Sequence, residues 1–280
     1  MPKLTTQQQE LFERLSKARR RGADLLEQPY MRGVKASVIE KYSDEAHFIY
    51  ELLQNADDVK ATKVRFVLSA AGVIFAHNGK IHFSLSDPDT EEEDSQQQQL
   101  GHINAITSIG NSNKYEAQIG KFGIGFKAVF QYVDTPEIYD PPFLFKIERF
   151  IVPVWLAQDH PARQPGETLF YLPFEERKKP VSQSFQDILA TLKNLIHPLL
   201  FLRNLTEITW TASENSQGKY TKSVNPVKIK PVPGNDLLVE RVCLKQAGSH
   251  HSPATQNLLV LTRPLTHSLS TTSGSSWLGR

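Results

Sequence analysis

The sequence lacks the features that mark several common protein classes. It contains one cysteine, Cys243, in 280 residues, which excludes an internal disulfide framework and fits a reducing compartment. It has no apolar run long enough to cross a bilayer, and Met1–Leu4 leads into a polar helix rather than the apolar core of a signal peptide. We therefore expect a soluble, cytoplasmic protein without a membrane partner.

An excess of charge of one sign is also missing. The formal net charge of +2 is too small to support nucleic acid as a partner. The short basic run Arg19–Arg21 is compatible with a nucleic-acid contact or with a solvated helix face, and the second is favoured because no other basic cluster accompanies it. The histidines lack the spacing of a metal site, and no Ser-His-Asp or Cys-His pattern has a known catalytic context.

The hydrophobic periodicity predicts an α+β fold. Helices are expected at about 5–27, 43–58, 100–106 and 184–196, and a β-hairpin at 61–76. Further strands are expected at 143–152, 167–172, 205–211, 220–229, 237–244 and 257–261. The stretch 87–99 is interpreted as a mobile, low-complexity surface insert without visible chemistry. Helices and strands do not alternate regularly, so a parallel βαβ fold is not favoured.

A glycine-rich stretch, Ile119–Phe130, suggests phosphate binding. Glycines let the backbone approach an anion, and a helix that begins there offers N–H groups to negative charge. Gly123, Gly125 and Ala128 match the dinucleotide pattern G-x-G-x-x-A, but a polar loop rather than a strand precedes them, so a Rossmann site is rejected. The spacing also excludes a Walker loop. Taken alone, this stretch is a weak signal.

A second candidate lies on the helix expected at 43–58. Glu51, Asn55 and Asp58 stand at positions i, i+4 and i+7, which places them on one helical face. An amide oxygen suits a hydrated divalent cation, and a glutamate can orient or deprotonate a water molecule. The alternative is an ordinary polar face exposed to solvent.

Four segments, in this order, resemble the conserved boxes of the GHKL ATPases, a superfamily that includes gyrase-type topoisomerases, ninety-kilodalton heat-shock chaperones, histidine kinases and mismatch-repair ATPases. They are Glu51–Asp58, His77–Gly79, Gly120–Phe126 and Gly166–Thr168. The residues of these segments are most similar to those of the sacsin-like branch. The resemblance covers about 43–174, and it implies a Bergerat fold: a two-layer sandwich with helices on one face of a mixed, mostly antiparallel sheet.

The resemblance assigns roles to individual residues. It implies that Glu51 is the general base that activates water, that Asn55 binds Mg²⁺, and that Asp58 supports the nucleotide. It also implies that the third box wraps the phosphates of ATP; its residues are Gly120, Lys121, Phe122, Gly123, Ile124, Gly125, Phe126 and Lys127. For Lys121 and Lys127, an ordinary surface position is an equal alternative to phosphate neutralisation.

The remaining implied contacts concern adenine and a lid. Thr168 resembles the strand hydroxyl that helps to hold adenine. Residues from about 101 to 121 would form a mobile lid, from which Ser112 and Lys114 reach the nucleotide.

One position departs from the family pattern. The second box usually begins with an aspartate that accepts the adenine amino proton, and His77 stands there. A neutral histidine accepts one hydrogen bond but carries no carboxylate charge. Asn78 is one substitute for that contact, and a turn histidine without a ligand role is the alternative. Gly79 is the first glycine of this box. Ile81 stands where the family has the second glycine.

These observations imply an ATP-binding module, a slow Mg²⁺-dependent ATPase that moves a lid within a chaperone-like or larger multidomain protein. The alternatives are a nucleotide-sensing scaffold without catalysis and an ATPase of DNA maintenance or defence. The expected domains are 1–203, which binds ATP, and 204–267, a β-rich extension or the start of a transducer region, followed by a disordered tail, 268–280. A homodimer or associated C-terminal domains are the expected partners besides ATP.

Overall fold

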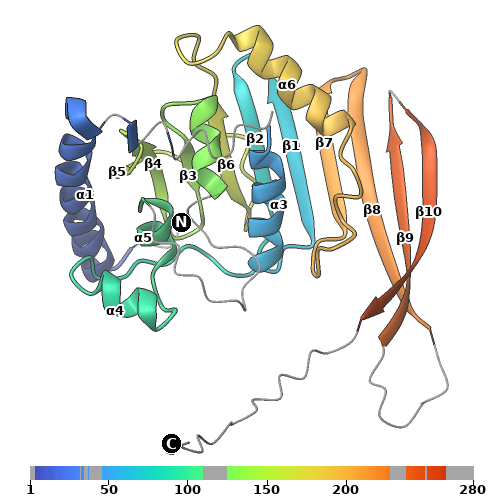
Figure 1. The fold of residues 1–280 in the computed structure, drawn as a ribbon, viewed down its shortest axis with the longest axis horizontal. Helices are drawn as coiled ribbons and strands as arrows, with labels where there is room; N and C mark the ends of the chain where they lie inside the picture. Colours follow the sequence, from blue (N-terminus) through green and yellow to red (C-terminus); the bar gives the residue numbers. More distant parts are fainter. Residues whose placement is uncertain are drawn as a thin grey trace, which may run out of the picture.

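The chain folds around one open sheet of ten strands, and α3 and α6 lie in front of this sheet in Figure 1. The structure, a computed structural model, describes residues 4–31, 33–34, 37, 46–109, 125–227, 238–249 and 251–262. The strand order is β10-β9-β8-β7-β1-β2-β6-β3-β4-β5. Among the strands in these ranges, β1 and β7 form the single parallel pair. The predicted α+β class with a mixed, mostly antiparallel sheet is confirmed.

The elements have the following bounds. The helices are α1 (Thr6–Leu26), α3 (Phe48–Asp58), α4 (Glu91–Gln96), α5 (His102–Ile106) and α6 (Val181–Lys193), with the 3-10 helices η1 (Pro29–Met31) and η2 (Gly125–Gln131). The strands are β1 (Lys63–Ser69), β2 (Gly72–His77), β3 (Glu137–Tyr139), β4 (Leu144–Glu148), β5 (Val152–Trp155), β6 (Thr168–Pro173), β7 (Glu207–Ser213), β8 (Ser216–Pro226), β9 (Leu238–Gly248) and β10 (His251–Thr262).

The sheet forms the core through rows of aromatic and aliphatic side chains. Phe66, Phe75 and Phe170 are directly paired neighbours on β1, β2 and β6, and Ile138 on β3 extends the row. All four are at most 2% exposed. Directly paired residues point to the same face of a sheet, so this row fixes which face the helices cover.

The first helix, expected at about 5–27, runs from Thr6 to Leu26. The Thr5 hydroxyl accepts a hydrogen bond from the backbone N–H of Gln8, and the Gln8 side chain returns a bond to Thr5, which completes a capping box. Phe12 and Leu15 are buried, and the Phe12 ring stacks on Trp155 of β5 with centroids 3.7 Å apart. The helix therefore covers the β5 end of the sheet.

One strand prediction needs correction, and one strand was not predicted. The single strand expected at 143–152 is wrong, because the chain turns at Arg149 and Phe150, which have φ values of 50° and 75°, and returns as β5. The sequence also gave no indication of β3, which has three residues between β6 and β4. Both arms of this hairpin are buried, so the sequence is apolar on either side of the turn. The hydrophobic pattern therefore does not indicate where the chain reverses.

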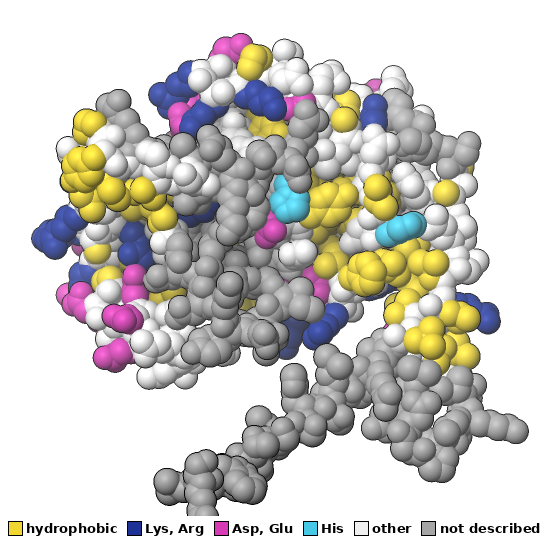
Figure 2. Space-filling view, viewed as in Figure 1, with side chains coloured by type: hydrophobic (Ala, Val, Ile, Leu, Met, Phe, Trp, Pro, Cys, Tyr) yellow, Lys and Arg dark blue, Asp and Glu magenta, His cyan; other side chains and the backbone are white. Residues whose placement is uncertain are grey.

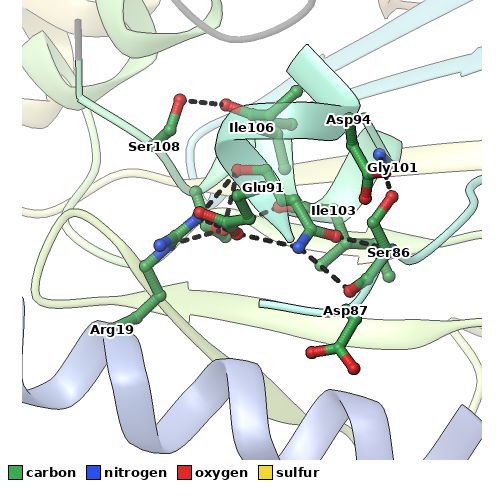
Figure 3. A network of polar contacts seen from close by, with 12 residues as sticks. Arg19, Ser86, Asp87, Glu91, Asp94, Gly101, Ile103, Ile106 and Ser108 are labelled. Atoms are coloured by element: carbon green, nitrogen blue, oxygen red, sulfur yellow. Dashed lines mark hydrogen bonds and ion pairs between the residues drawn. The ribbon is translucent and has the colours of Figure 1, made fainter. Parts of the chain in front are cut away.

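The stretch 87–99 is not an isolated insert. It contains α4, and Glu91 binds Arg19 of α1 at 2.6 Å in a contact where both side chains are mostly buried (Figure 3). Arg19 also donates to the Thr107 hydroxyl at 3.3 Å and to the Asn104 carbonyl at 3.2 Å. The segment is therefore anchored to the fold, where it joins α1 to α5, and the expectation that it is a mobile insert is not supported.

Strands β7 to β10 extend the same sheet, since β7 pairs with β1. The proposed division at residue 204 stays a prediction. The tail at 268–280 and residues 43–45, where the second helix was expected to begin, lie outside the described residues. In the described ranges, no helix combines the length and the apolar character needed to cross a membrane.

Candidate functional site

The polar face of α3 is not an ordinary solvent-exposed face. Ile49, Leu52 and Leu53 bury one side of the helix in the core. On the neighbouring side Asn55 is 6% exposed, and the Glu51 side chain is 21% exposed. The alternative of a solvated polar face is therefore wrong for Asn55, and the buried position needs a chemical reason.

Glu51 meets the glycine-rich segment directly. A Cβ atom built on Gly125 would lie 1.8 Å from Oε2 of Glu51 and 2.3 Å from its Cδ. Any side chain at this position would displace the carboxylate of Glu51 from its present place. On its other side, Oε1 of Glu51 lies 3.6 Å from Nε2 of His47. The structure thus brings the first and third predicted boxes into contact.

Asp58, the third polar residue of this face, has a carboxylate oxygen without a protein partner. Its Oδ2 is buried and, within the described residues, accepts no hydrogen bond. Burial, together with the neighbouring Asp57 charge, raises the pKa of Asp58 to about 7, although Arg203 opposes this shift. Unpaired buried polar groups are rare in folded proteins and are typical of positions that bind a ligand or a water molecule.

Asp57 has a different role, which the sequence pattern did not reveal. Its carboxylate accepts hydrogen bonds from the backbone N–H groups of Arg203, Asn204 and Leu205 at 2.7 to 2.9 Å. It therefore ties the end of α3 to the segment that leads into β7. Of the two neighbouring aspartates, only Asp58 is available to the site.

The predicted second box lies against the end of α3. Lys80 donates its backbone N–H to the Val59 carbonyl at 2.8 Å, and a Cβ on Gly79 would lie 2.6 Å from Cγ2 of Val59. The Asn78 side chain accepts from the N–H groups of Thr62 and Lys63, both at 2.9 Å. Asn78 is thus engaged in the start of β1, which argues against it as a substitute for the missing aspartate.

His77 lies in a polar row at one end of the sheet. It pairs with Thr168 across β2 and β6, and Asp140 follows β3 at the next position of the same row. The His77 ring is 4% exposed, and its Nδ1 accepts the backbone N–H of Gly79 at 3.1 Å. Burial lowers the pKa of His77 to about 4, so the ring is neutral and its proton is on Nε2.

Asp140 is the residue of this row that the sequence analysis missed. It is fully buried, and its carboxylate accepts from the Thr168 hydroxyl at 2.5 Å, the Phe83 N–H at 3.0 Å and Nδ1 of His82 at 3.1 Å. In the sequence it precedes Pro141, so it resembles a turn residue, and only the strand pairing reveals its position next to Thr168.

Lys127 is not a surface lysine. It is 1% exposed and donates to the carbonyls of Ile106 and Phe150 at 2.8 and 2.9 Å. Its ammonium also lies 4.8 Å from the centroid of the Phe150 ring. The surface alternative is therefore wrong, and the side chain connects η2 to the end of α5 and to the turn before β5. Its predicted phosphate contact is untested, but the described bonds direct the ammonium to carbonyls.

The rest of the third box is only partly visible. Phe126 is buried and packs on Phe170 with ring centroids 5.8 Å apart, which seats η2 on the sheet. The helix expected after the glycines is a 3-10 helix. The other predicted residues lie outside the described residues: Ser112, Lys114, Gly120, Lys121, Phe122, Gly123 and Ile124.

Comparison with known proteins gives a family for part of this region. Residues 27–140 match the family described as the Sacsin domain. The chain is 36% identical over 116 residues to Protein NO VEIN of Arabidopsis thaliana and 30% identical over 123 residues to Sacsin of Homo sapiens. These matches support a sacsin-like family. They cover 39% and 40% of this chain but 4% and 3% of the two relatives, so the chain spans a small part of either protein.

Proposed function

We propose that this chain contains an ATP-binding module that hydrolyses ATP slowly with Mg²⁺. The observation that carries the proposal is the contact between Glu51 and Gly125, one helical turn from the mostly buried Asn55. A carboxylate held against the backbone of a glycine-rich segment is suited to water activation beside a bound phosphate. The sacsin-like match of residues 27–140 includes both residues and is consistent with this function.

The described residues fit the metal and the nucleotide. Asn55, a residue that is 6% exposed, would supply an amide oxygen, and a hard cation such as Mg²⁺ prefers oxygen ligands. When bound, the ion would neutralise phosphate charge. Asp58 would accept a hydrogen bond from the nucleotide or its water through its unpartnered Oδ2. Glu51 would hold the attacking water and take up its proton.

The first prediction concerns turnover. Glu51→Gln keeps the size of the side chain but removes its basicity, so ATP hydrolysis should fall by about a hundredfold or more while ATP binding is retained. The measurement is phosphate release with Mg²⁺, together with ATP affinity by calorimetry. Equal hydrolysis by wild type and variant would remove Glu51 from the mechanism. ATP binding without phosphate release in the wild type would instead favour the nucleotide-sensing scaffold.

The second prediction concerns the metal. Asn55→Ala should weaken MgATP binding about tenfold or more, because it removes the proposed ligand, and it should affect ATP binding in EDTA much less. Gln54→Ala is a matched control on the same helical turn. A loss of affinity that is the same with and without Mg²⁺ would contradict a metal-ligand role for Asn55.

A further inference from the structure

The two edges of the sheet, formed by β5 and β10, differ in their protection (Figure 1). Strand β5 has four residues, one of which is Pro153, and Phe12 of α1 stacks on its Trp155. A short strand, a proline and a covering helix all prevent a further strand from pairing with an edge. Strand β10 has twelve residues, and within the described ranges no strand pairs with its outer side. The β10 edge therefore offers backbone groups to a further strand.

The side chains of β10 also lack the charges that commonly protect an edge strand. None of its twelve residues is Lys, Arg, Asp or Glu, and Leu259 and Leu261 are each 62% exposed. These two leucines lie on one face of the sheet, because they are two residues apart in a strand. Leu258 and Val260, on the opposite face, pack against the core and hold the strand in place. A long, apolar and uncharged edge is suited to strand pairing.

We propose that β10 pairs antiparallel with β10 of a second copy of this chain, with Leu259 of each copy opposite Leu261 of the other. This inference does not depend on the proposed nucleotide site. In a two-fold symmetric pair the same strand lies on both sides, so a charged side chain near the axis would face an equal charge. The absence of charge from β10 meets this requirement, whereas a strand that binds a charged partner would carry the opposite charge.

The register follows from the positions of the exposed leucines and of Pro253. The pairing of β10 with β9 is irregular between His251 and Ala254, and Pro253 has no N–H group to donate. The first part of the strand is therefore poorly suited to a second partner. A two-fold axis at Val260 keeps the pairing within the second part and brings the four exposed leucines of the two copies together on one face.

The charged residues of β9 are compatible with this arrangement. Arg241 pairs with Leu259, and Glu240 pairs with Val260. In the dimer the two Glu240 positions would be three strand spacings apart, or about 14 Å, and the two Arg241 positions, which lie on a diagonal, would be further apart. These separations exceed the Debye length of about 8 Å at physiological ionic strength. The like charges on β9 would therefore oppose the dimer only weakly.

The test measures association of the full chain by sedimentation equilibrium at about 1 to 100 μM. We expect a reversible equilibrium between monomer and dimer for the wild type. Replacing both Leu259 and Leu261 by Lys places four like charges at the contact and should raise the dimer dissociation constant about a hundredfold or more. Replacing both by Glu should have the same effect.

An equal mixture of the Lys and Glu variants separates strand pairing from a general structural effect. In the mixed dimer each Lys faces a Glu of the other copy, so association should recover. The matched control is Phe201→Lys, which changes a residue that is 85% exposed outside β10, and it should leave the dissociation constant unchanged. Amide hydrogen exchange in residues 257–262 should also slow as the wild-type dimer forms, because N–H groups gain partners.

Four outcomes would overturn this inference. The first is a wild type that stays monomeric over the whole concentration range. The second is a dimer that both double variants leave intact, and the third is a dimer that Phe201→Lys disrupts, because another surface would then mediate association. The fourth is loss of association in both double variants without recovery in their mixture, because the leucines would then support the strand rather than the contact. None of these outcomes affects the proposed function, which is tested by nucleotide binding and turnover.

Discussion

Asp57 and Asp58 show how strongly the role of a residue depends on its immediate surroundings. They are chemically identical neighbours at the end of α3. Asp57 satisfies three backbone N–H groups, whereas Oδ2 of Asp58 has no partner. An unpaired buried carboxylate costs stability and is retained in proteins mainly where it serves a site. For Asp58, the unpartnered Oδ2 is the observation that favours a role in ligand binding.

Lys127 leads to a prediction about pH. Burial, with a further contribution from Arg19, lowers the pKa of Lys127 from 10.5 to about 7. Between these values the unfolded chain keeps a proton that the folded chain has released, so the free energy of unfolding should increase from pH 7 to pH 10. Below pH 7 both states are protonated, and the full cost of burying the ammonium remains. Each pH unit in the window contributes up to about 1.4 kcal/mol.

The comparison is with Lys127→Met, in which this contribution to the pH dependence should disappear. Lys17→Met is the control, because Lys17 is exposed on α1. Urea unfolding at several pH values gives the measurement. If wild type and Lys127→Met have parallel curves between pH 7 and pH 10, Lys127 is not buried as an amine in solution.

Some of these residues could be predicted from the sequence and others could not. The spacing of Glu51 and Asn55 on one helical turn places them together without any knowledge of the fold. Asp140 and Lys127 acquire their roles through strand pairing and through carbonyls of Ile106 and Phe150, which are about 20 residues away along the chain. No local pattern encodes such contacts, so sequence reasoning missed Asp140 and could not exclude a surface position for Lys127.

At the scale of elements, α1 is joined to α4 and α5 mainly through Arg19. This guanidinium reaches Glu91, Thr107 and the Asn104 carbonyl in a partly buried network. Arg19→Ala should lower the free energy of unfolding by about 1 to 3 kcal/mol, because it removes the cationic partner of Glu91 where water has limited access and leaves this carboxylate with the Asn104 amide. Chemical denaturation measures the change.

Two neighbouring arginines serve as controls for Arg19. Arg14 also binds aspartates, but its side chain is 43% exposed, and exposed ion pairs contribute about 1 kcal/mol or less. Arg20 is exposed and should have almost no effect. A loss for Arg14→Ala as large as that for Arg19→Ala would mean that burial does not govern this network. The engagement of Arg19 also argues against a basic nucleic-acid surface at 19–21.

Elements with a strong local signal agree with the prediction, and those without one do not. The helices α1 and α6 and the β1–β2 hairpin follow from periodicity, capping and a glycine turn. The β4–β5 hairpin turns through Arg149 and Phe150 at positive φ, which these residue types rarely adopt and no pattern announces. Lys127 donates to the carbonyl of Phe150, so a tertiary contact helps to hold this turn.

At the scale of the whole molecule, one sheet connects both predicted domains. Trp210 and Tyr220 belong to the same core as Phe66, and the Tyr220 hydroxyl donates to the carbonyls of Leu192 and Lys193. We therefore expect one cooperative unfolding transition rather than two. Two variants test this expectation, and both carry Trp277→Phe. One also carries Trp210→Phe, so that Trp155 is its fluorescent reporter, and the other carries Trp155→Phe, so that Trp210 is the reporter. The two should give the same midpoint of unfolding. Separate midpoints would support the division at residue 204.

One face of the molecule carries exposed apolar side chains between α6 and β7 (Figure 2). Ile196 and Phe201 are 76% and 85% exposed, and Ile196 also lines a cavity of about 230 Å³ between residues 195–199 and strands β8 to β10. Contiguous exposed apolar surface is typical of contact surfaces. The expected partners, a second copy or associated C-terminal domains, stay a prediction.

The parallel pairing of β1 with β7 has a consequence for synthesis of the chain. Lys63 pairs with Glu207, and Asp57 binds the backbone of Leu205, so the end of α3 and one edge of β1 find their partners only after about 140 further residues have been translated. Contacts this distant in sequence slow folding and leave strand edges exposed in the meantime. On the ribosome, the C-terminal end of the helix that carries Glu51 and Asn55 would therefore stay without these partners until Leu205 has been made.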